Sequence, residues 1–259
     1  MSLDYDPGIE IALPEGALRI DFADQLHHPA RVVRTLSEIR ASLENPEVLG
    51  PEELYAIYMD VAAAGDLALL IRQNLLFGLV RYAAGVVGDE PVRSQGHVHA
   101  VSASCGTSTP ELYEFWEGAG VVYMQEQVAA DPGRCFAVQA GPGDKVLVPP
   151  GWAHLTVNAG VRTPMAFGAW CVRDYGFDYS GIPERHGLAW YPKVTGDVIT
   201  WMPNPHYGVS ELTRKKPRIY TEFGISTDAI YRQWQSDPDR MGFVARPAAV
   251  SALWQDFVP

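Results

Sequence analysis

Residues 143–158 read GDKVLVPPGWAHLTVN, and this stretch decides the fold class. Gly143-Asp144 is a turn signal, and the run KVLV at residues 145–148 is typical of a buried strand. A Pro-Pro-Gly bend then precedes His154. The stretch therefore indicates a turn, a strand, a bend and a potential metal ligand in succession.

A second segment, GHVH, supplies two more imidazoles. Residues i and i+2 of a strand point to the same side, so His97 and His99 can converge on one point inside a barrel. Glu111 follows after a loop. Three neutral imidazoles and one carboxylate suit Fe(II), Mn(II), Ni(II), Co(II) or Zn(II) and leave open positions for the oxygen atoms of a substrate. The sequence predicts a divalent metal held by His97, His99, Glu111 and His154.

The chain around these segments is rich in strand signals. Residues 67–175 contain short runs of β-branched and aromatic residues, beginning with LALLIRQ, separated by Gly, Pro, Asp or Asn. This rhythm predicts antiparallel strands that close into a sandwich or barrel. We expect a barrel over residues 67–192, an N-terminal extension over 1–66 whose strand and helix pack on it, and a C-terminal extension over 193–259.

Local patterns in the two extensions predict helices. Residues 31–43 have helical spacing of apolar side chains, and residues 54–61 fit a strand or a helix. Ser226 or Thr227 can cap a short helix that ends at Asp237-Pro238.

Composition limits the partners and the compartment. The net charge of −11 disfavours nucleic acid and anionic membranes, and the basic run at residues 214–218 is expected to be a solvated face. We expect neither a transmembrane helix nor a secretory signal. The odd count and spacing of Cys105, Cys135 and Cys171 fit neither a disulfide framework nor a Cys-x-x-Cys site. Reduced thiols in the cytoplasm are therefore expected.

The two histidine segments resemble the paired motifs of cupins, whose fold is a double-stranded, jelly-roll-like β-helix barrel. The phrases RSQGHVHA, PELYEFWEGAG, VPPGWAHLTVNAG and DYSGIPERHG more specifically resemble the cupin-type (archaeal-type) glucose-6-phosphate isomerases, over about residues 31–192. The chain departs from the cupin pattern at Pro91, where a Gly is usual. It also departs in the eleven residues 100–110, a longer gap than cupins have before the glutamate.

This resemblance implies a reaction and its residues. The chain is expected to interconvert glucose 6-phosphate and fructose 6-phosphate in glycolysis and gluconeogenesis, as a cytoplasmic homodimer with one divalent ion per subunit, Fe(II) before Mn(II), Ni(II), Co(II) or Zn(II). Glu111 is the candidate base, and Tyr113, two residues on, would face the same side and assist proton transfer. An enediol route and a hydride shift both remain open.

The resemblance also implies contacts to the substrate phosphate. The matching positions are Tyr58, Ser94, Gly96 (through its backbone N–H) and Tyr179, with Arg81 or Arg93 as a supporting cation. Two other functions remain open, a metal-dependent cupin dioxygenase with the same four ligands and a non-catalytic sugar-binding cupin.

Overall fold

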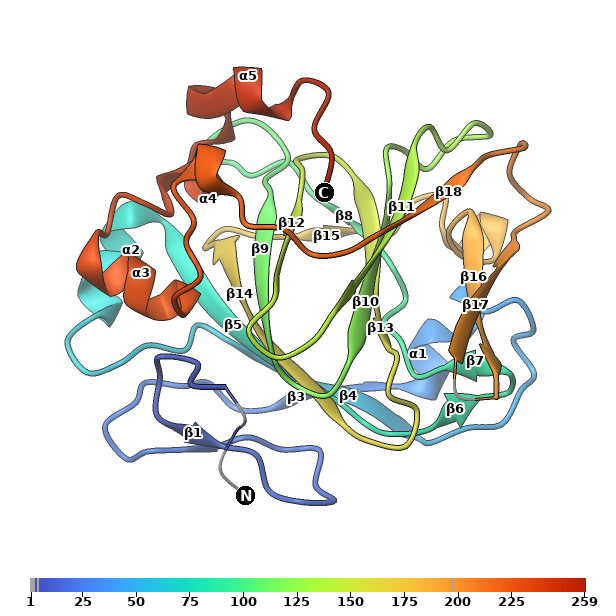
Figure 1. Cartoon of the computed structure of the whole chain (residues 1–259), viewed down its shortest axis with the longest axis horizontal. Helices are drawn as coiled ribbons and strands as arrows, with labels where there is room; N and C mark the ends of the chain where they lie inside the picture. The colour runs from blue at the N-terminus through green and yellow to red at the C-terminus, as the bar shows by residue number, and fades with distance from the viewer. Residues whose placement is uncertain (1–2, 4, 197) are drawn as a thin grey trace.

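Two facing β-sheets form a barrel at the centre of the molecule (Figure 1). The structure is a computed structural model that describes residues 3, 5–196 and 198–259. The larger sheet has the order β12 (Lys145–Val148), β9 (Glu111–Glu117), β14 (Met165–Val172), β5 (Leu75–Tyr82), β4 (Glu53–Met59) and β3 (Val32–Thr35). The smaller has the order β13 (Ala153–Asn158), β10 (Gly120–Gln125), β11 (Cys135–Ala140) and β18 (Leu212–Lys215). The predicted all-β core is confirmed.

Short strand pairs complete the described β-structure around the barrel. Within it, β8 pairs with β15 beside the histidines, and β16 pairs with β17 as a hairpin. The bounds of these pairs are β1 (Ile11–Ala12), β2 (Asp21–Phe22), β6 (Val86–Val87), β7 (Glu90–Pro91), β8 (Val98–His99), β15 (Phe177–Asp178), β16 (Trp190–Thr195) and β17 (Val198–Pro203).

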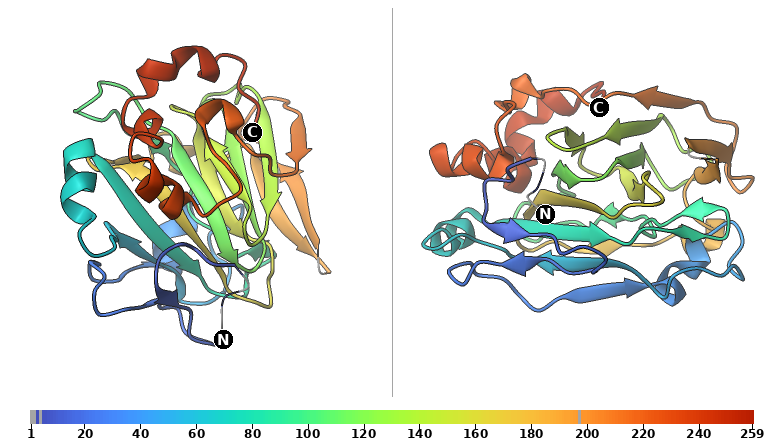
Figure 2. Two further views of the ribbon diagram at one scale, coloured as in Figure 1. Left: turned by 60° about the vertical axis from the view of Figure 1, so that its left-hand side comes forward. Right: turned by 60° about the horizontal axis from the view of Figure 1, so that its bottom comes forward.

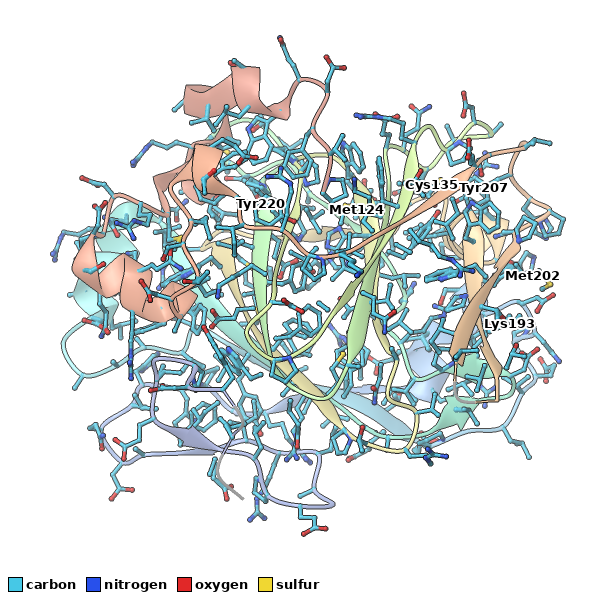
Figure 3. The ribbon with its side chains drawn as sticks, in the orientation of Figure 1. Met124, Cys135, Lys193, Met202, Tyr207 and Tyr220 are labelled. Atoms are coloured by element: carbon cyan, nitrogen blue, oxygen red, sulfur yellow. The ribbon has the colours of Figure 1, made fainter. Side chains whose placement is uncertain are left out.

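The barrel interior is an apolar core contributed by both sheets. Alternation along the strands sends Tyr113 and Phe115 of β9 inward to meet Met124 of β10. The neighbouring positions point outward, and Cys135 of β11 packs with Tyr207 on the outer side of the smaller sheet (Figure 3). Because both faces of these strands are covered, their sequences are nearly continuous runs of apolar residues.

The chain ends cover the outer face of the larger sheet. The C-terminal helices α3 (Ile230–Ser236), α4 (Gly242–Ala245) and α5 (Ser251–Trp254) follow one another on this side of the molecule (Figure 2). Tyr231 and Trp234 of α3 join Trp170 of β14 in one buried aromatic cluster. The extensions thereby bury apolar surface that a bare barrel would expose.

Close packing in this cluster requires a glycine at position 168. A Cβ there would lie 2.3 Å from the Trp116 side chain and 2.6 Å from that of Phe77. Both rings are fully buried and lack room to retreat. Gly168 therefore lets two large aromatic side chains pack directly against the backbone of β14.

The structure corrects two of the local predictions. Residues 31–43 are not one helix, because β3 pairs with β4 before the short helix α1 (Leu36–Ile39) begins at a Thr35–Glu38 capping box. A single 3₁₀ turn, residues 40–42, follows α1. The strand predicted for LALLIRQ is wrong, because this segment is the helix α2 (Leu67–Gln73), which ends at Asn74 in the left-handed conformation.

The other local predictions have definite outcomes. The ambiguous residues 54–61 are mostly strand, in β4, and the helix predicted before Asp237 is confirmed as α3. The predicted cap by Ser226 or Thr227 is wrong, because α3 has Ala229 at its N-cap and no side-chain cap. In the described part of the chain, no helix has the length and apolar character needed to cross a membrane.

Candidate metal centre

Four predicted ligand residues come together at one end of the barrel interior. The candidate ligand atoms of His97, His99, Glu111 and His154 all lie within 4.8 Å of one another. A backbone bridge aligns the two histidine segments, since His97 N donates to His154 O at 3.0 Å and His154 N donates to His97 O at 2.9 Å. The ring centroids of His97 and His99 lie 5.2 Å apart, so the two side chains point to the same side, as their i and i+2 spacing predicts.

Glu111 joins the histidines because it begins β9. Its register is fixed by pairing with Val148 of β12, and its side chain points inward with Tyr113. One carboxylate oxygen, Oε2, lies 3.2 Å from His99 Nε2 and 3.3 Å from His154 Nε2. The same oxygen accepts a hydrogen bond of 2.6 Å from the Tyr113 hydroxyl. The expectation that Tyr113 faces the same side as Glu111 is therefore met by the geometry.

The imidazole rings are oriented as metal ligands require. The ring nitrogen Nδ1 of His99 lies 2.8 Å from Thr109 O, and that of His154 lies 3.2 Å from Trp152 O. These carbonyl acceptors place a proton on Nδ1 and leave the Nε2 lone pair free. The Nε2 atoms of His97 and His154 are buried without a hydrogen bond. A divalent cation would satisfy these convergent lone pairs, so the four residues fit the predicted ion.

Protonation tendencies in the cluster agree with this fit. Burial, reinforced by the neighbouring histidines, holds the pKa of His97 well below its usual value, and burial also lowers the pKa of His154. Burial acts in the same direction on His99, but contact with Glu111 outweighs it and raises that pKa. Burial alone would raise the pKa of Glu111, yet the adjacent imidazoles of His154 and His99 keep it well below the usual range. An ionised carboxylate beside mostly neutral imidazoles is the ligand state that a divalent cation needs.

The long insert at residues 100–110 helps to position the candidate metal ligands. Asp174 accepts hydrogen bonds from the Ser102 hydroxyl at 2.9 Å and from Ser104 N at 2.9 Å. These bonds and one from Asn74 outweigh burial and lower the pKa of Asp174 to about 2. The anchored insert ends at Thr109, the residue whose carbonyl orients His99. The additional residues therefore loop outward without shifting Glu111 from the start of β9.

A cavity beside the cluster contains most of the predicted substrate contacts. Ser94, Gly96 and Tyr179 line it, together with Tyr113. The Ser94 hydroxyl oxygen accepts a hydrogen bond of 3.0 Å from Thr156 N, which ties this residue to β13.

The structure contradicts the predicted substrate contact of Tyr58. Its ring faces the outer core of the larger sheet, and its hydroxyl accepts a hydrogen bond of 3.2 Å from Ile20 N. Tyr55 lines the cavity instead. Positions 55 and 58 differ by an odd number, so a regular strand must send their side chains to opposite faces. Strand alternation therefore predicts that only one of the two tyrosines faces the cavity, but not which one.

Neither cation suggested for the phosphate reaches the cavity. Arg81 is buried on the outer side in an ion pair of 3.0 Å with Glu117, and Arg93 is buried in an ion pair of 2.7 Å with Glu90. Sequence reasoning missed Arg34 of β3, which does line the cavity. Its position was hidden because residues 31–43 resemble a helix.

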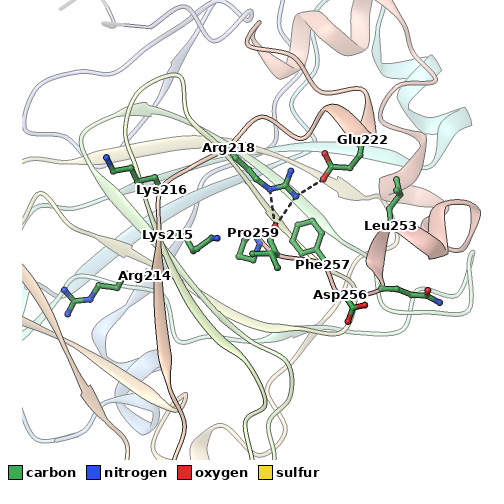
Figure 4. A pocket seen from close by; sticks show the side chains of 11 residues that line it. Arg214, Lys215, Lys216, Arg218, Glu222, Leu253, Asp256, Phe257 and Pro259 are labelled. Carbon is green, nitrogen blue, oxygen red and sulfur yellow. Dashed lines mark hydrogen bonds and ion pairs between the residues drawn. The ribbon is translucent and has the colours of Figure 1, made fainter.

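A separate basic groove lies at the C-terminal end of the chain (Figure 4). Arg214, Lys215 and Lys216 line it. Arg218 has a structural role there, donating to Val258 O at 3.0 Å and to Glu222 Oε1 at 2.7 Å. The groove shares none of its described lining residues with the cavity beside the metal ligands.

A β-barrel that directs three histidines and one glutamate to a single buried point defines the cupin class of metal proteins. Within that class, the model of the family described as glucose-6-phosphate isomerase (GPI) matches residues 32–207. The chain belongs to the glucose-6-phosphate isomerase family. This membership confirms the isomerase expectation over the dioxygenase and the sugar-binding alternatives.

Individual relatives agree with the family match. Glucose-6-phosphate isomerase of Thermococcus gammatolerans is 30% identical over 190 residues, which cover 69% of this chain and 88% of the relative. The enzyme of Thermococcus kodakarensis is 31% identical over 163 residues, covering 60% and 76%. Separately, a solved structure of a deletion mutant of Bacillus subtilis oxalate decarboxylase aligns with a TM-score of 0.33 at 17% identity, covering 51% of this chain and 28% of the other.

Proposed function

We propose that this chain interconverts glucose 6-phosphate and fructose 6-phosphate in the cavity beside its four metal ligands. Family membership gives the reaction, and the observation that carries the site is the buried convergence of His97, His99, Glu111 and His154. A bound divalent cation would polarise the sugar carbonyl and stabilise negative charge on the neighbouring oxygens.

Glu111 and Tyr113 have different roles in the proton transfers of the reaction. Aldose–ketose isomerisation moves a hydrogen between C1 and C2 of the open-chain sugar. Glu111 is the ionised carboxylate of the site and can accept a proton. Burial, and then the charge of Glu111, raises the pKa of Tyr113 well above its usual value, so Tyr113 stays protonated. Tyr113 therefore acts as a hydrogen-bond donor, toward Glu111 or toward a sugar oxygen.

Replacing this hydroxyl gives a direct test. We expect Tyr113→Phe to lower kcat by about 10²-fold, the usual contribution of a positioned proton donor, with little change in KM. Metal content, measured by elemental analysis, should be unchanged because Tyr113 is not a ligand. A variant with wild-type kcat would remove Tyr113 from the mechanism.

The function as a whole is tested by metal reconstitution. The purified protein is stripped of metal and assayed with fructose 6-phosphate after addition of Fe(II), Mn(II), Ni(II), Co(II) or Zn(II). We expect activity to return with at least one of these ions at about one ion per chain. A fully loaded protein that converts no fructose 6-phosphate with any of the five would contradict the proposed function.

Four further properties of the protein belong to the proposal. Iron is the proposed native ion, since a mixed nitrogen and oxygen ligand set suits Fe(II). A homodimer is supported by β3, which lies at the edge of the larger sheet with Val32 50% exposed. A cytoplasmic location is supported by the three cysteines, all of which are free thiols. The division at residues 66 and 192 is likewise a proposal, in which the N-terminal extension contributes β3 and β4 to the larger sheet and the C-terminal extension contributes β18 to the smaller one.

A further inference from the structure

The cavity beside the metal ligands has a cation on its wall, Arg34 of β3. Its side chain is 31% exposed, so it lies between the cavity and solvent. Burial raises the pKa values of Tyr55 and Tyr179, and the positive charge of Arg34 opposes both increases. The guanidinium is therefore within electrostatic reach of two hydroxyl groups that line the same cavity.

The proposed metal ion aside, this charge has no counterpart among the described residues of the cavity wall. Among the described residues that line the cavity, Arg34 is the only lysine or arginine. Arg81 and Arg93 are engaged in buried ion pairs elsewhere. The chain as a whole carries a net charge of −11, which repels a phosphate dianion. A sugar phosphate that enters this cavity therefore needs local positive charge, and Arg34 supplies it.

Contacts outside the cavity hold Arg34 in place. Its Nη1 donates to Glu38 Oε1 at 3.1 Å. Glu38 is fixed in turn, because its Oε2 accepts a hydrogen bond of 2.7 Å from Thr35 N in the capping box of α1. A guanidinium carries five N–H donors in a planar fork, so one bond to Glu38 leaves others to contact a phosphate. Ordering this side chain in advance reduces the entropy that binding would otherwise cost.

We propose that Arg34 binds the phosphate group of the substrate at the cavity mouth, beside the hydroxyls of Tyr55 and Tyr179. This inference rests on the proposed function and adds to it the orientation in which the sugar phosphate binds. With the phosphate at the mouth, the carbon chain runs inward and presents C1 and C2 to the metal ligands. Arg34 thereby selects phosphorylated over unphosphorylated sugars.

Steady-state kinetics test the role of Arg34 in catalysis. We expect Arg34→Gln to raise KM for fructose 6-phosphate by about 10- to 100-fold, the value of one charge-assisted contact, with kcat within about 3-fold of wild type. Arg34→Lys should recover part of the loss, since it keeps the charge without the fork. Arg31→Gln is the matched control, because Arg31 contacts Leu18 O and does not line the cavity. An unchanged KM in Arg34→Gln would overturn the inference.

Equilibrium binding separates this inference from the proposed function, since it needs no turnover. Calorimetry with 6-phosphogluconate and gluconate compares ligands that differ in the phosphate. Arg34→Gln should weaken binding of 6-phosphogluconate and leave that of gluconate unchanged, a result that supports the phosphate site even in a protein without isomerase activity. Equal weakening of both ligands would indicate a merely structural role and overturn the inference. A wild-type protein that does not bind 6-phosphogluconate would also overturn the inference.

Discussion

We expect His154→Ala to lose both its metal and its activity. His154 is 1% exposed, and its Nε2 is a buried atom without a hydrogen bond in the described structure. The truncation removes one of four ligands and leaves a buried space that cannot supply another. Loss of one preorganised electrostatic group costs about 10²–10³-fold in kcat, so loss of the ion itself should cost about 10³-fold or more.

Elemental analysis and the fructose 6-phosphate assay are the two measurements for this variant. His206→Ala is the control, since His206 is an exposed histidine outside the cavity, and it should keep wild-type metal content and turnover. Circular dichroism establishes that both variants are folded. A folded His154→Ala protein with a full complement of metal would show that the ligand assignment is wrong.

The ligand cluster was predictable because its determinants are local. His97 and His99 share a face by strand alternation, and His154 follows its Pro-Pro-Gly bend at a fixed distance. Glu111 depends less on local sequence, since an unusually long insert precedes it. Its position depends on pairing of β9 with β12 and β14, which are contacts between distant parts of the chain. Single-sequence patterns do not show such pairing.

The substrate side of the cavity was less predictable for a related reason. Tyr55 and Tyr58 lie on the same strand, and only the sheet decides which face is the interior. Arg34 belongs to a segment with helical spacing that tertiary pairing turned into β3. Glu114 and Glu117, the other carboxylates of the PELYEFWEG segment, are excluded as bases because they form outer ion pairs with Lys145 and Arg81.

The largest loss of stability is expected from Lys145→Met. The Lys145 ammonium and the Glu114 carboxylate lie 3.1 Å apart, and both side chains are completely buried. Lys145 also donates to Thr227 O at 2.7 Å, and Glu114 accepts from Ile230 N at 3.1 Å, so the pair joins the barrel to the C-terminal extension. Removing one partner of a buried pair leaves an uncompensated charge, at a cost of about 3–5 kcal/mol in the free energy of unfolding.

The pH dependence of this loss identifies its cause. Burial already raises the pKa of Glu114 despite the opposing charge of Lys145, and loss of that charge must raise it further. Glu114 then binds its proton more tightly in the folded than in the unfolded chain. The deficit of Lys145→Met should therefore be smallest below the unfolded-state pKa of Glu114 and should grow as pH rises toward the folded-state pKa. Chemical denaturation at several pH values measures this trend.

Two variants distinguish the buried charge from lost packing. Lys145→Met combined with Glu114→Gln removes both charges, so it should recover part of the stability and lose the pH dependence. Lys216→Met changes an exposed lysine in the basic run and should have almost no effect. A deficit that is the same at every pH and is unrelieved by Glu114→Gln would mean that the methylene contacts of Lys145, rather than its charge, hold the C-terminal extension on the barrel.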